Sequence, residues 1–266
     1  MRCMPEVFAS MLGGVPAGAV DACADSLDTG RQKISAIATI ALSHFSREIN
    51  LSMSAASVRR KKPSKVHRHK PLNNFGAAYF RRFYLDPATR VVTNGEMRSR
   101  AAVIASILGH VQIPVRRILD AGCGLGLLRK PLAEFFPRAR YSGLEASPYL
   151  CKRFGWIAGS VMDFAPSKPF DLMICYDVLQ YLPDPEAARA IANFAKLTRS
   201  ALYVSALTTE DWRDNCDRSR TDRDVHLRPG AWYRRRLQKS FRYIGVGVWL
   251  RKDVTATLWD MEQPRA

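Results

Sequence analysis

Residues 119–126 read Leu-Asp-Ala-Gly-Cys-Gly-Leu-Gly and join a short apolar run to a helical pattern. The run from Val115 to Leu119 predicts a β-strand, and residues 127–136 have the apolar spacing of a helix. Glycine permits a tight turn and lets backbone N–H groups approach a ligand, and the helix N-terminus adds a positive dipole end. A strand, a glycine-rich turn and a helix in this order predict a ligand-binding site.

The glycines stand at positions 122, 124 and 126, and position 127 is leucine. A dinucleotide fingerprint would instead read G-x-G-x-x-G and cradle a pyrophosphate, so a pyridine-nucleotide oxidoreductase is disfavoured. Glu145 ends a second expected strand, residues 140–144. A carboxylate at this distance from the glycine turn suits the two hydroxyls of a ribose, because it can accept a hydrogen bond from each.

Two further landmarks follow in order. Residues 159–164, Gly-Ser-Val-Met-Asp-Phe, read as a loop, and residues 170–182 read as a buried strand that runs into a loop. The glycine turn, Glu145 and these two segments together resemble the motifs of class I S-adenosylmethionine-dependent methyltransferases. The resemblance covers roughly residues 75–259.

The resemblance implies an α/β fold, a doubly wound and mostly parallel seven-stranded sheet with helices on both faces and a C-terminal antiparallel hairpin. It also implies S-adenosyl-L-methionine as cofactor, with the glycine turn under its amino-acid end and Asp163 accepting from the adenine amino group. The residues expected to bind the cofactor are Asp120, Ala121, Gly122, Cys123, Gly124, Gly126, Glu145, Ala146, Met162, Asp163, Phe164 and Tyr176.

Alternating elements support this fold. Helices are expected at residues 96–110, from Ser147 and at 184–197, and strands near Trp156, at 170–176 and at 201–205. Aromatic residues at helical spacing from Phe75 to Tyr84 predict a helix that mainly packs on the core. The hairpin is expected to pair residues 242–250 with 254–259 through a turn at 251–253.

Residues 211–236 are too charged for a core and too long for a tight turn, which predicts a substrate lid or pocket wall. His226 is the segment's single histidine and the candidate catalytic base. The expected substrate pocket holds Tyr84, Asp177, Trp212 and Tyr233. Four arginines of the segment either bind an anionic substrate or pair with the interleaved aspartates; they are Arg218, Arg220, Arg223 and Arg228.

At two places the sequence differs from motifs that are common in the resembling family, and each difference makes certain methyl-transfer mechanisms less suitable for this chain. Gln180 and Tyr181 stand where many members that act on small molecules carry histidine, so mechanisms with a histidine base there do not transfer. The Asn-Pro-Pro-Tyr type motif of amino-directed methyltransferases is also absent, since residues 176–179 read Tyr-Asp-Val-Leu. This disfavours N-methylation of adenine or glutamine.

The composition suits a globular protein with a basic character, since 47% of the 266 residues are hydrophobic and the formal net charge is +17. The chain is expected to have two parts. Residues 1–70 are expected to be a weakly structured extension and residues 71–266 a class I methyltransferase domain. Within the extension, residues 59–70 carry seven Lys and Arg and no acid, which fits either a solvated linker or a contact with nucleic acid. Met53, just before this segment, is a second candidate start of translation.

The cysteine pattern and the lengths of the apolar runs indicate in which compartment of the cell the protein is expected. The six cysteines form no C-x-x-C pair and no metal-ligand spacing, so no metal is expected and the thiols fit a cytoplasmic protein. The N-terminus lacks the pattern of a secretory signal, and no apolar run is long enough for a membrane span.

The leading prediction is a methyltransferase that acts on a small or medium organic acceptor. The alternatives are an RNA or ribosomal-protein methyltransferase recruited through residues 59–70, and a non-catalytic S-adenosylmethionine-binding regulator. The acceptor and the oligomeric state are left open.

Overall fold

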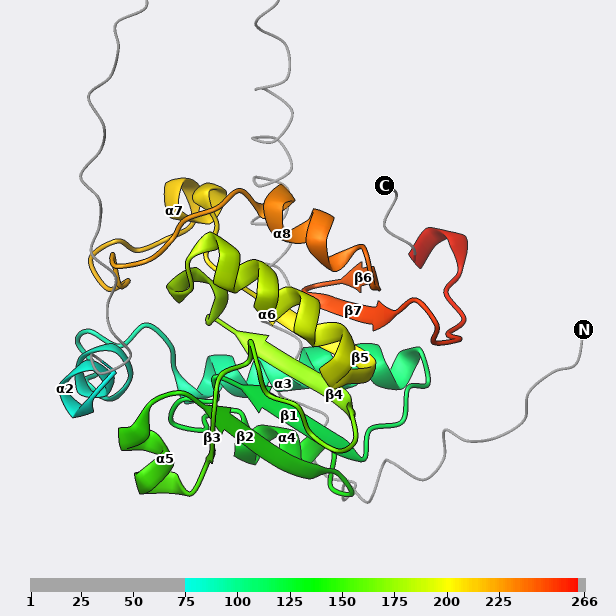
Figure 1. The fold of residues 1–266 in the computed structure, drawn as a ribbon, viewed down its shortest axis with the longest axis horizontal. Coiled ribbons are helices and arrows are strands. Elements are labelled where there is room, and N and C mark those ends of the chain that lie inside the picture. Colours follow the sequence, from blue (N-terminus) through cyan, green and yellow to red (C-terminus); the bar gives the residue numbers. More distant parts are fainter. Residues whose placement is uncertain (1–74, 263–266) are drawn as a thin grey trace, which may run out of the picture. The chain divides into compact units, whose positions relative to one another are not determined.

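The computed structural model describes residues 75–262 (Figure 1). The expected extension, its basic segment 59–70 and Met53 lie outside the described residues. The division at residue 70 therefore stays a prediction.

Seven strands form one sheet in the order β3-β2-β1-β4-β5-β7-β6 (Figure 1). Strands β1 to β5 run parallel, and β7 is antiparallel to both of its neighbours, β5 and β6. The expected doubly wound, mostly parallel sheet with a C-terminal antiparallel hairpin is thus confirmed. The strands are β1 Arg117–Ala121, β2 Arg140–Glu145, β3 Ile157–Ala158, β4 Phe170–Tyr176, β5 Thr198–Ser205, β6 Phe241–Gly245 and β7 Val248–Arg251.

Helices cover both faces of the sheet. The helical elements are α2 Ala77–Phe80, η2 Arg81–Leu85, α3 Asn94–His110, α4 Arg129–Phe135, α5 Pro148–Phe154, η3 Leu179–Tyr181, α6 Asp184–Leu197, α7 Thr209–Asp214, α8 Gly230–Leu237 and η4 Asp260–Glu262. None of the helices in the described part of the chain has the length and apolar character that a membrane crossing requires.

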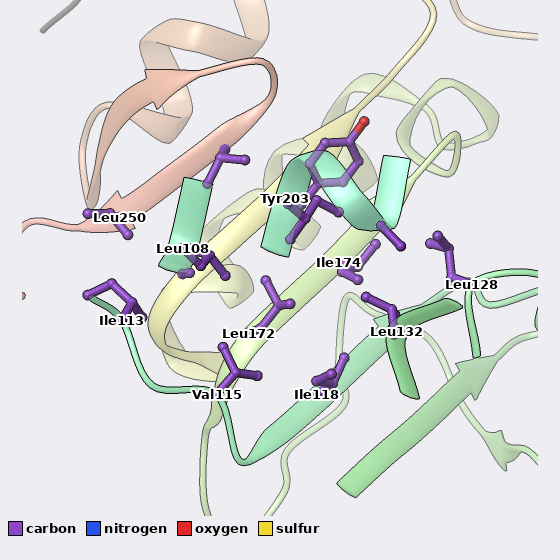
Figure 2. Close-up of a cluster of buried hydrophobic side chains, with 14 of the residues drawn as sticks. Leu108, Ile113, Val115, Ile118, Leu128, Leu132, Leu172, Ile174, Tyr203 and Leu250 are labelled. Carbon is purple, nitrogen blue, oxygen red and sulfur yellow. The ribbon is translucent and has the colours of Figure 1, made fainter. Parts of the chain in front are cut away.

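Two hydrophobic clusters lie on opposite faces of the sheet because side chains alternate along each strand. Leu172 and Ile174 of β4 join the first cluster, with residues of α3 and α4 (Figure 2). Met173 and Cys175 join the second, with residues of α6 and α8. Both faces of β4 are therefore buried, which explains its nearly continuous apolar sequence.

Local capping sets several helix boundaries. Helix α3 begins two residues before the expected Glu96, because the Thr93 side chain accepts from the Glu96 backbone N–H and the Glu96 carboxylate accepts from the Thr93 backbone N–H. Ser147 caps α5, as its position before the helix predicts. Helix α6 has the bounds that its sequence pattern predicts.

The position of the C-terminal hairpin was predicted wrongly. Both of its strands lie within residues 241–251, and the chain reverses at Val246-Gly247 rather than at residues 251–253. Gly245, Val246 and Gly247 all have positive φ, which glycine adopts without strain. The Gly-Val-Gly sequence was the available signal for this turn. Residues 254–259 contain no strand.

Candidate active site

Two adjoining cavities lie at the carboxyl ends of the strands. The first, which we call the glycine-loop cavity, has a volume of about 510 Å³ and is lined by the loops after β1, β2, β3 and β4 and by α2. The second, the arginine cavity, has a volume of about 720 Å³ and is lined by α3, the loop before it and residues 207–222. Four residues line both cavities and form the wall between them: Tyr79, Tyr84, Asp177 and Tyr181.

The glycine loop lies close to the chain that follows β4. Gly122 has φ +75°, and a Cβ atom there would lie 2.3 Å from Cγ2 of Val178. Its backbone N–H donates to the Leu144 carbonyl over 2.7 Å, which ties the loop to the end of β2. Only glycine combines this backbone conformation with this close approach. The loop therefore presents its backbone to the cavity.

Glu145 closes the same cavity from β2. One of its carboxylate oxygens accepts from the Gly124 N–H over 2.8 Å, and the other accepts from the Ser147 N–H over 2.8 Å. Glu145 is 9% exposed and lines the cavity. Each oxygen keeps a further lone pair, so the carboxylate can still accept from a ligand diol.

The loop at residues 159–164 is fixed from α6. The Asn193 side-chain amide donates to the carbonyls of Val161 and Phe164 over 2.9 and 3.0 Å. Gly159, Ser160, Val161 and Met162 line the cavity. The sequence did not identify Asn193, because an amide on an expected helix carries no signal of the loop it supports.

The expected cofactor residues divide into two groups. Gly122, Gly124, Glu145, Ala146 and Met162 line the glycine-loop cavity. The others lie outside its lining; these are Asp120, Ala121, Cys123, Gly126, Asp163, Phe164 and Tyr176. For these seven, the geometry does not favour the expected contact.

Several of the seven have a structural explanation. The Asp163 side chain is 66% exposed and pairs with Arg189 over 3.1 Å, and Phe164 packs against the second cluster. Gly126 lies against Trp156, which a Cβ atom would approach to 2.6 Å. Tyr176 lines the arginine cavity instead.

Asp120 and Cys123 line a small space of about 40 Å³ beneath the glycine loop. Asp120 is 3% exposed, and the Tyr141 hydroxyl donates to its carboxyl over 2.6 Å. Burial raises the pKa of Asp120 to about 7, although the Tyr141 hydrogen bond opposes this shift. Asp120 is therefore a buried carboxyl that lines this small space and not the glycine-loop cavity.

The N-terminal aromatic residues contribute more than packing. Phe80 and Phe83 are buried as expected, but Phe75, Tyr79, Phe80 and Tyr84 also line the glycine-loop cavity. The hydroxyl groups of Tyr79 and Tyr181 are 2.9 Å apart and share a hydrogen bond. This bond connects α2 to η3 across the wall between the cavities.

Asp177 follows β4 directly and has φ +55°, a left-handed conformation that is uncommon outside glycine. Its backbone N–H donates to the Ser205 carbonyl over 3.0 Å. Burial raises the pKa of Asp177, and the hydrogen bond with Tyr176, the positive charge of Arg100 and the hydrogen bond with Gln180 oppose the shift. A carboxyl with a raised pKa at the junction of two cavities is suited to accept a proton.

Three expected residues of the lid lie away from both cavities. His226 lines neither, and its backbone N–H donates to the Gln180 carbonyl over 2.7 Å. Trp212 lines neither and lies beneath the Arg218 guanidinium. Tyr233 is buried in the second cluster, where its hydroxyl accepts from Arg228 over 3.1 Å. The geometry therefore does not favour His226 as base or the other two as pocket residues.

Arg228 has a structural role in place of the suggested anion site. It is 3% exposed, and its guanidinium donates to the carbonyls of Leu179 and Leu182 and to Asp184. These contacts fasten the start of α8 to the segment that carries Gln180 and Tyr181. Arg218 and Arg223 also donate to backbone carbonyls, whereas Arg220 lines the arginine cavity and lies 3.7 Å from Asp217.

The glycine-loop cavity lies where the strand order reverses, between β1 and β4, which is the place where doubly wound α/β sheets bind their ligands. Residues 119–200 match the family model described as a methyltransferase domain. This segment is therefore a methyltransferase domain, in agreement with the resemblance of the sequence motifs to class I S-adenosylmethionine-dependent methyltransferases. S-adenosylmethionine is the cofactor that this resemblance implies.

Individual relatives agree with this assignment. A ubiquinone biosynthesis O-methyltransferase of Xanthomonas campestris is 31% identical over 115 residues, which are 38% of this chain and 47% of that protein. A magnesium-protoporphyrin O-methyltransferase of Synechocystis is 28% identical over 149 residues, which are 50% of this chain and 64% of that protein. The chain thus spans about half the length of the curated relatives it matches.

This chain can also be superposed on a solved structure of the Synechocystis magnesium protoporphyrin IX methyltransferase with bound S-adenosylmethionine. The superposition covers 68% of this chain and 93% of the other chain. The identity is 19% and the TM-score is 0.48.

Proposed function

We propose that this protein transfers a methyl group from S-adenosylmethionine to a small or medium organic acceptor. The observation that carries the proposal is the pair of adjoining cavities with a shared wall at Asp177. Methyl transfer needs two ligands that meet at one point, and this arrangement provides a separate space for each.

The glycine-loop cavity fits the cofactor. The loop backbone at Gly122 and Gly124 leaves room where a side chain would intrude, and the Glu145 carboxylate keeps acceptor capacity for a ribose diol. Gly159 to Met162 offer a surface for the adenine, with Met162 as its apolar neighbour. When bound, S-adenosylmethionine supplies an activated methyl group. The protein's own contribution is alignment of the acceptor and exclusion of water.

Asp177 is the proposed proton acceptor when the nucleophile is a hydroxyl or an amine. It lines both cavities, and its raised pKa gives it more affinity for a proton than an exposed carboxyl has. His226 does not line either cavity. Asp177 therefore replaces it as the candidate base.

The test is calorimetric titration of S-adenosylhomocysteine into wild type and Glu145→Gln. The glutamine can accept from only one of the two backbone N–H groups that Glu145 now satisfies, so we expect at least about tenfold weaker binding. Glu134→Gln, an exposed change on α4, is the matched control. Wild type that is folded but does not bind S-adenosylhomocysteine would overturn the proposal.

Three finer points remain predictions from the sequence. They are a cytoplasmic location, a contact of residues 59–70 with nucleic acid, and the non-catalytic alternative. RNA binding that depends on salt and disappears on deletion of residues 1–70 would support the second. Methyl transfer to any acceptor in an assay with labelled donor would exclude the third.

A further inference from the structure

We infer that the arginine cavity takes an acceptor that carries a carboxylate, with Arg100 as the residue that selects it. This inference rests on the proposed function and names the substrate class of the same site. It follows from how the charged side chains of that cavity are paired.

Arg100 is a half-buried cation whose charge interacts with Asp177 and Glu96 but forms no direct ion pair with either of them. It projects from α3 and lies over the Tyr176 ring, with its guanidinium carbon 4.0 Å from the ring centroid. Its side-chain hydrogen bonds go to two neutral hydroxyls, those of Tyr203 and Tyr176. Among the described residues no carboxylate lies within ion-pair distance of it.

The same cavity holds both of the buried side-chain atoms that lack a hydrogen-bond partner within residues 75–262. These atoms are Nε of Arg100 and Oε1 of Gln180. Gln180 is 4% exposed and, like Arg100, lines the arginine cavity. An unpaired buried polar atom costs free energy, so two in one wall indicate groups that a ligand completes.

Five carboxylates line this cavity, those of Glu96, Asp177, Asp211, Asp217 and Asp222, and three of them are held by a nearby backbone N–H. Glu96 is held by Thr93, Asp211 by Thr208 and Asp217 by Ser219. Each of these carboxylates accepts a backbone N–H, which neutralises part of its charge locally.

Three arginines line the same cavity, and of these Arg220 pairs with Asp217. Arg90 also lines the cavity, and no ion pair involves it among the described residues. Arg100 therefore has a second unpaired cation in the same wall. Arg90 and Arg100 are thus the two arginines of this wall with which a carboxylate of a ligand can pair.

A carboxylate matches these atoms better than a neutral group does. It supplies the direct ion pair that no described residue gives Arg100, and it offers two oxygens to the planar guanidinium, including Nε. Gln180 Oε1 needs a donor, which a hydroxyl or amino group on the same acceptor can provide. The tyrosines of the shared wall suit an acceptor with an apolar or aromatic body.

The test uses the full-length protein saturated with S-adenosylhomocysteine. Thermal unfolding is followed with a panel of aromatic and aliphatic hydroxy acids, such as 4-hydroxybenzoate, each beside its uncharged amide. We expect some of the acids to raise the unfolding temperature and their amides to have no effect. In Arg100→Gln the affinity for those acids should fall by about tenfold or more.

The controls separate binding from folding. Arg98→Gln changes an exposed arginine of the same helix and should bind the acids as wild type does. Arg100→Lys keeps the charge without the planar fork and should bind them with intermediate affinity. Arg100→Gln should keep wild-type affinity for S-adenosylhomocysteine, which a merely structural role of Arg100 does not predict.

Three outcomes would overturn the inference: no acid stabilises the complex, acids and amides stabilise it equally, or Arg100→Gln binds the acids as well as wild type does. Failure of the cofactor proposal has a different signature, since S-adenosylhomocysteine itself would then not bind.

Discussion

The two cavities meet at Asp177 but are built from different parts of the chain. The glycine-loop cavity is made largely of backbone turns at strand ends, with Glu145 from β2. The arginine cavity is made of side chains from α3, the loop before it and residues 207–222, which are distant in the sequence. A site made of backbone turns depends on local conformation, whereas a site made of converging side chains depends on the tertiary fold.

The largest expected effect tests the backbone-built cavity. In Gly122→Ala the new Cβ atom would lie 2.3 Å from Val178, in a residue with φ +75°. The left-handed conformation alone costs about 1–2 kcal/mol, and the clash must move the loop. We expect no measurable binding of S-adenosylhomocysteine by calorimetry.

Gly155→Ala is the matched control for this change, because Gly155 has φ +69° but no atom within 4 Å of its Cβ position. It should lose some stability and keep cofactor binding. Wild-type affinity in Gly122→Ala would show that the loop is not held as tightly as its contacts indicate.

The second effect concerns the segment that joins the cavities. Arg228→Ala leaves the carbonyls of Leu179 and Leu182 without their donor in a buried site. We expect the free energy of unfolding, measured with urea, to fall by about 3 kcal/mol. The exposed Arg234→Ala on the same helix should change it by less than about 0.5 kcal/mol. Equal losses in the two variants would contradict the role assigned to Arg228.

The third effect is a dependence of stability on pH that arises from Asp120, which lies beneath the glycine loop. The pKa of Asp120 is raised from 3.8 to about 7, so the folded protein keeps a proton there that the unfolded chain releases. The protonated Asp120 carboxyl therefore contributes to the free energy of unfolding. This contribution is fully present below pH 3.8 and is lost as the pH rises through about 7. In Asp120→Asn, which does not titrate, stability should fall less between pH 5 and pH 8 than in wild type.

The difference between the two pH profiles should reach on the order of 2–4 kcal/mol in urea unfolding. The amide oxygen of the Asp120→Asn variant can still accept from the Tyr141 hydroxyl, so the fold should persist. The exposed carboxyl variant Asp163→Asn is the control. Parallel pH profiles for wild type and Asp120→Asn would refute the protonated state of Asp120.

The smallest effect tests the shared wall. Tyr79→Phe removes the hydroxyl bond to Tyr181 and keeps the ring. We expect S-adenosylhomocysteine to bind about two- to fivefold more weakly, because one hydrogen bond between neutral groups is lost. Tyr181→Phe should have the same effect, and the double variant should add little. A loss above about tenfold would mean that a hydroxyl contacts the ligand directly.

The sequence predicted the fold and the backbone-built cavity well for a physical reason. Glycine spacing, an acid at a strand end and alternating apolar runs act locally, so β4, α6 and the placement of Gly122 and Glu145 follow from them. The position of the hairpin was predicted wrongly because the apolar runs on both sides of residues 251–253 were given more weight than the Gly-Val-Gly turn at 245–247.

The arginine cavity was less predictable. Charge alone singled out Arg228, but its partners lie more than 40 residues away and make it structural. Arg100 carried no signal, since one arginine in an amphipathic helix resembles an exposed one. Its lack of a direct ion pair with any described carboxylate is visible only in the folded chain.

The most direct test of two adjoining cavities with one meeting point is a crystal structure of the complex with S-adenosylhomocysteine. The account predicts the ligand in the glycine-loop cavity, its ribose at Glu145 and its sulfur toward the wall formed by Tyr79, Tyr84, Asp177 and Tyr181. A ligand bound elsewhere, or with its sulfur turned away from Asp177, would contradict the account.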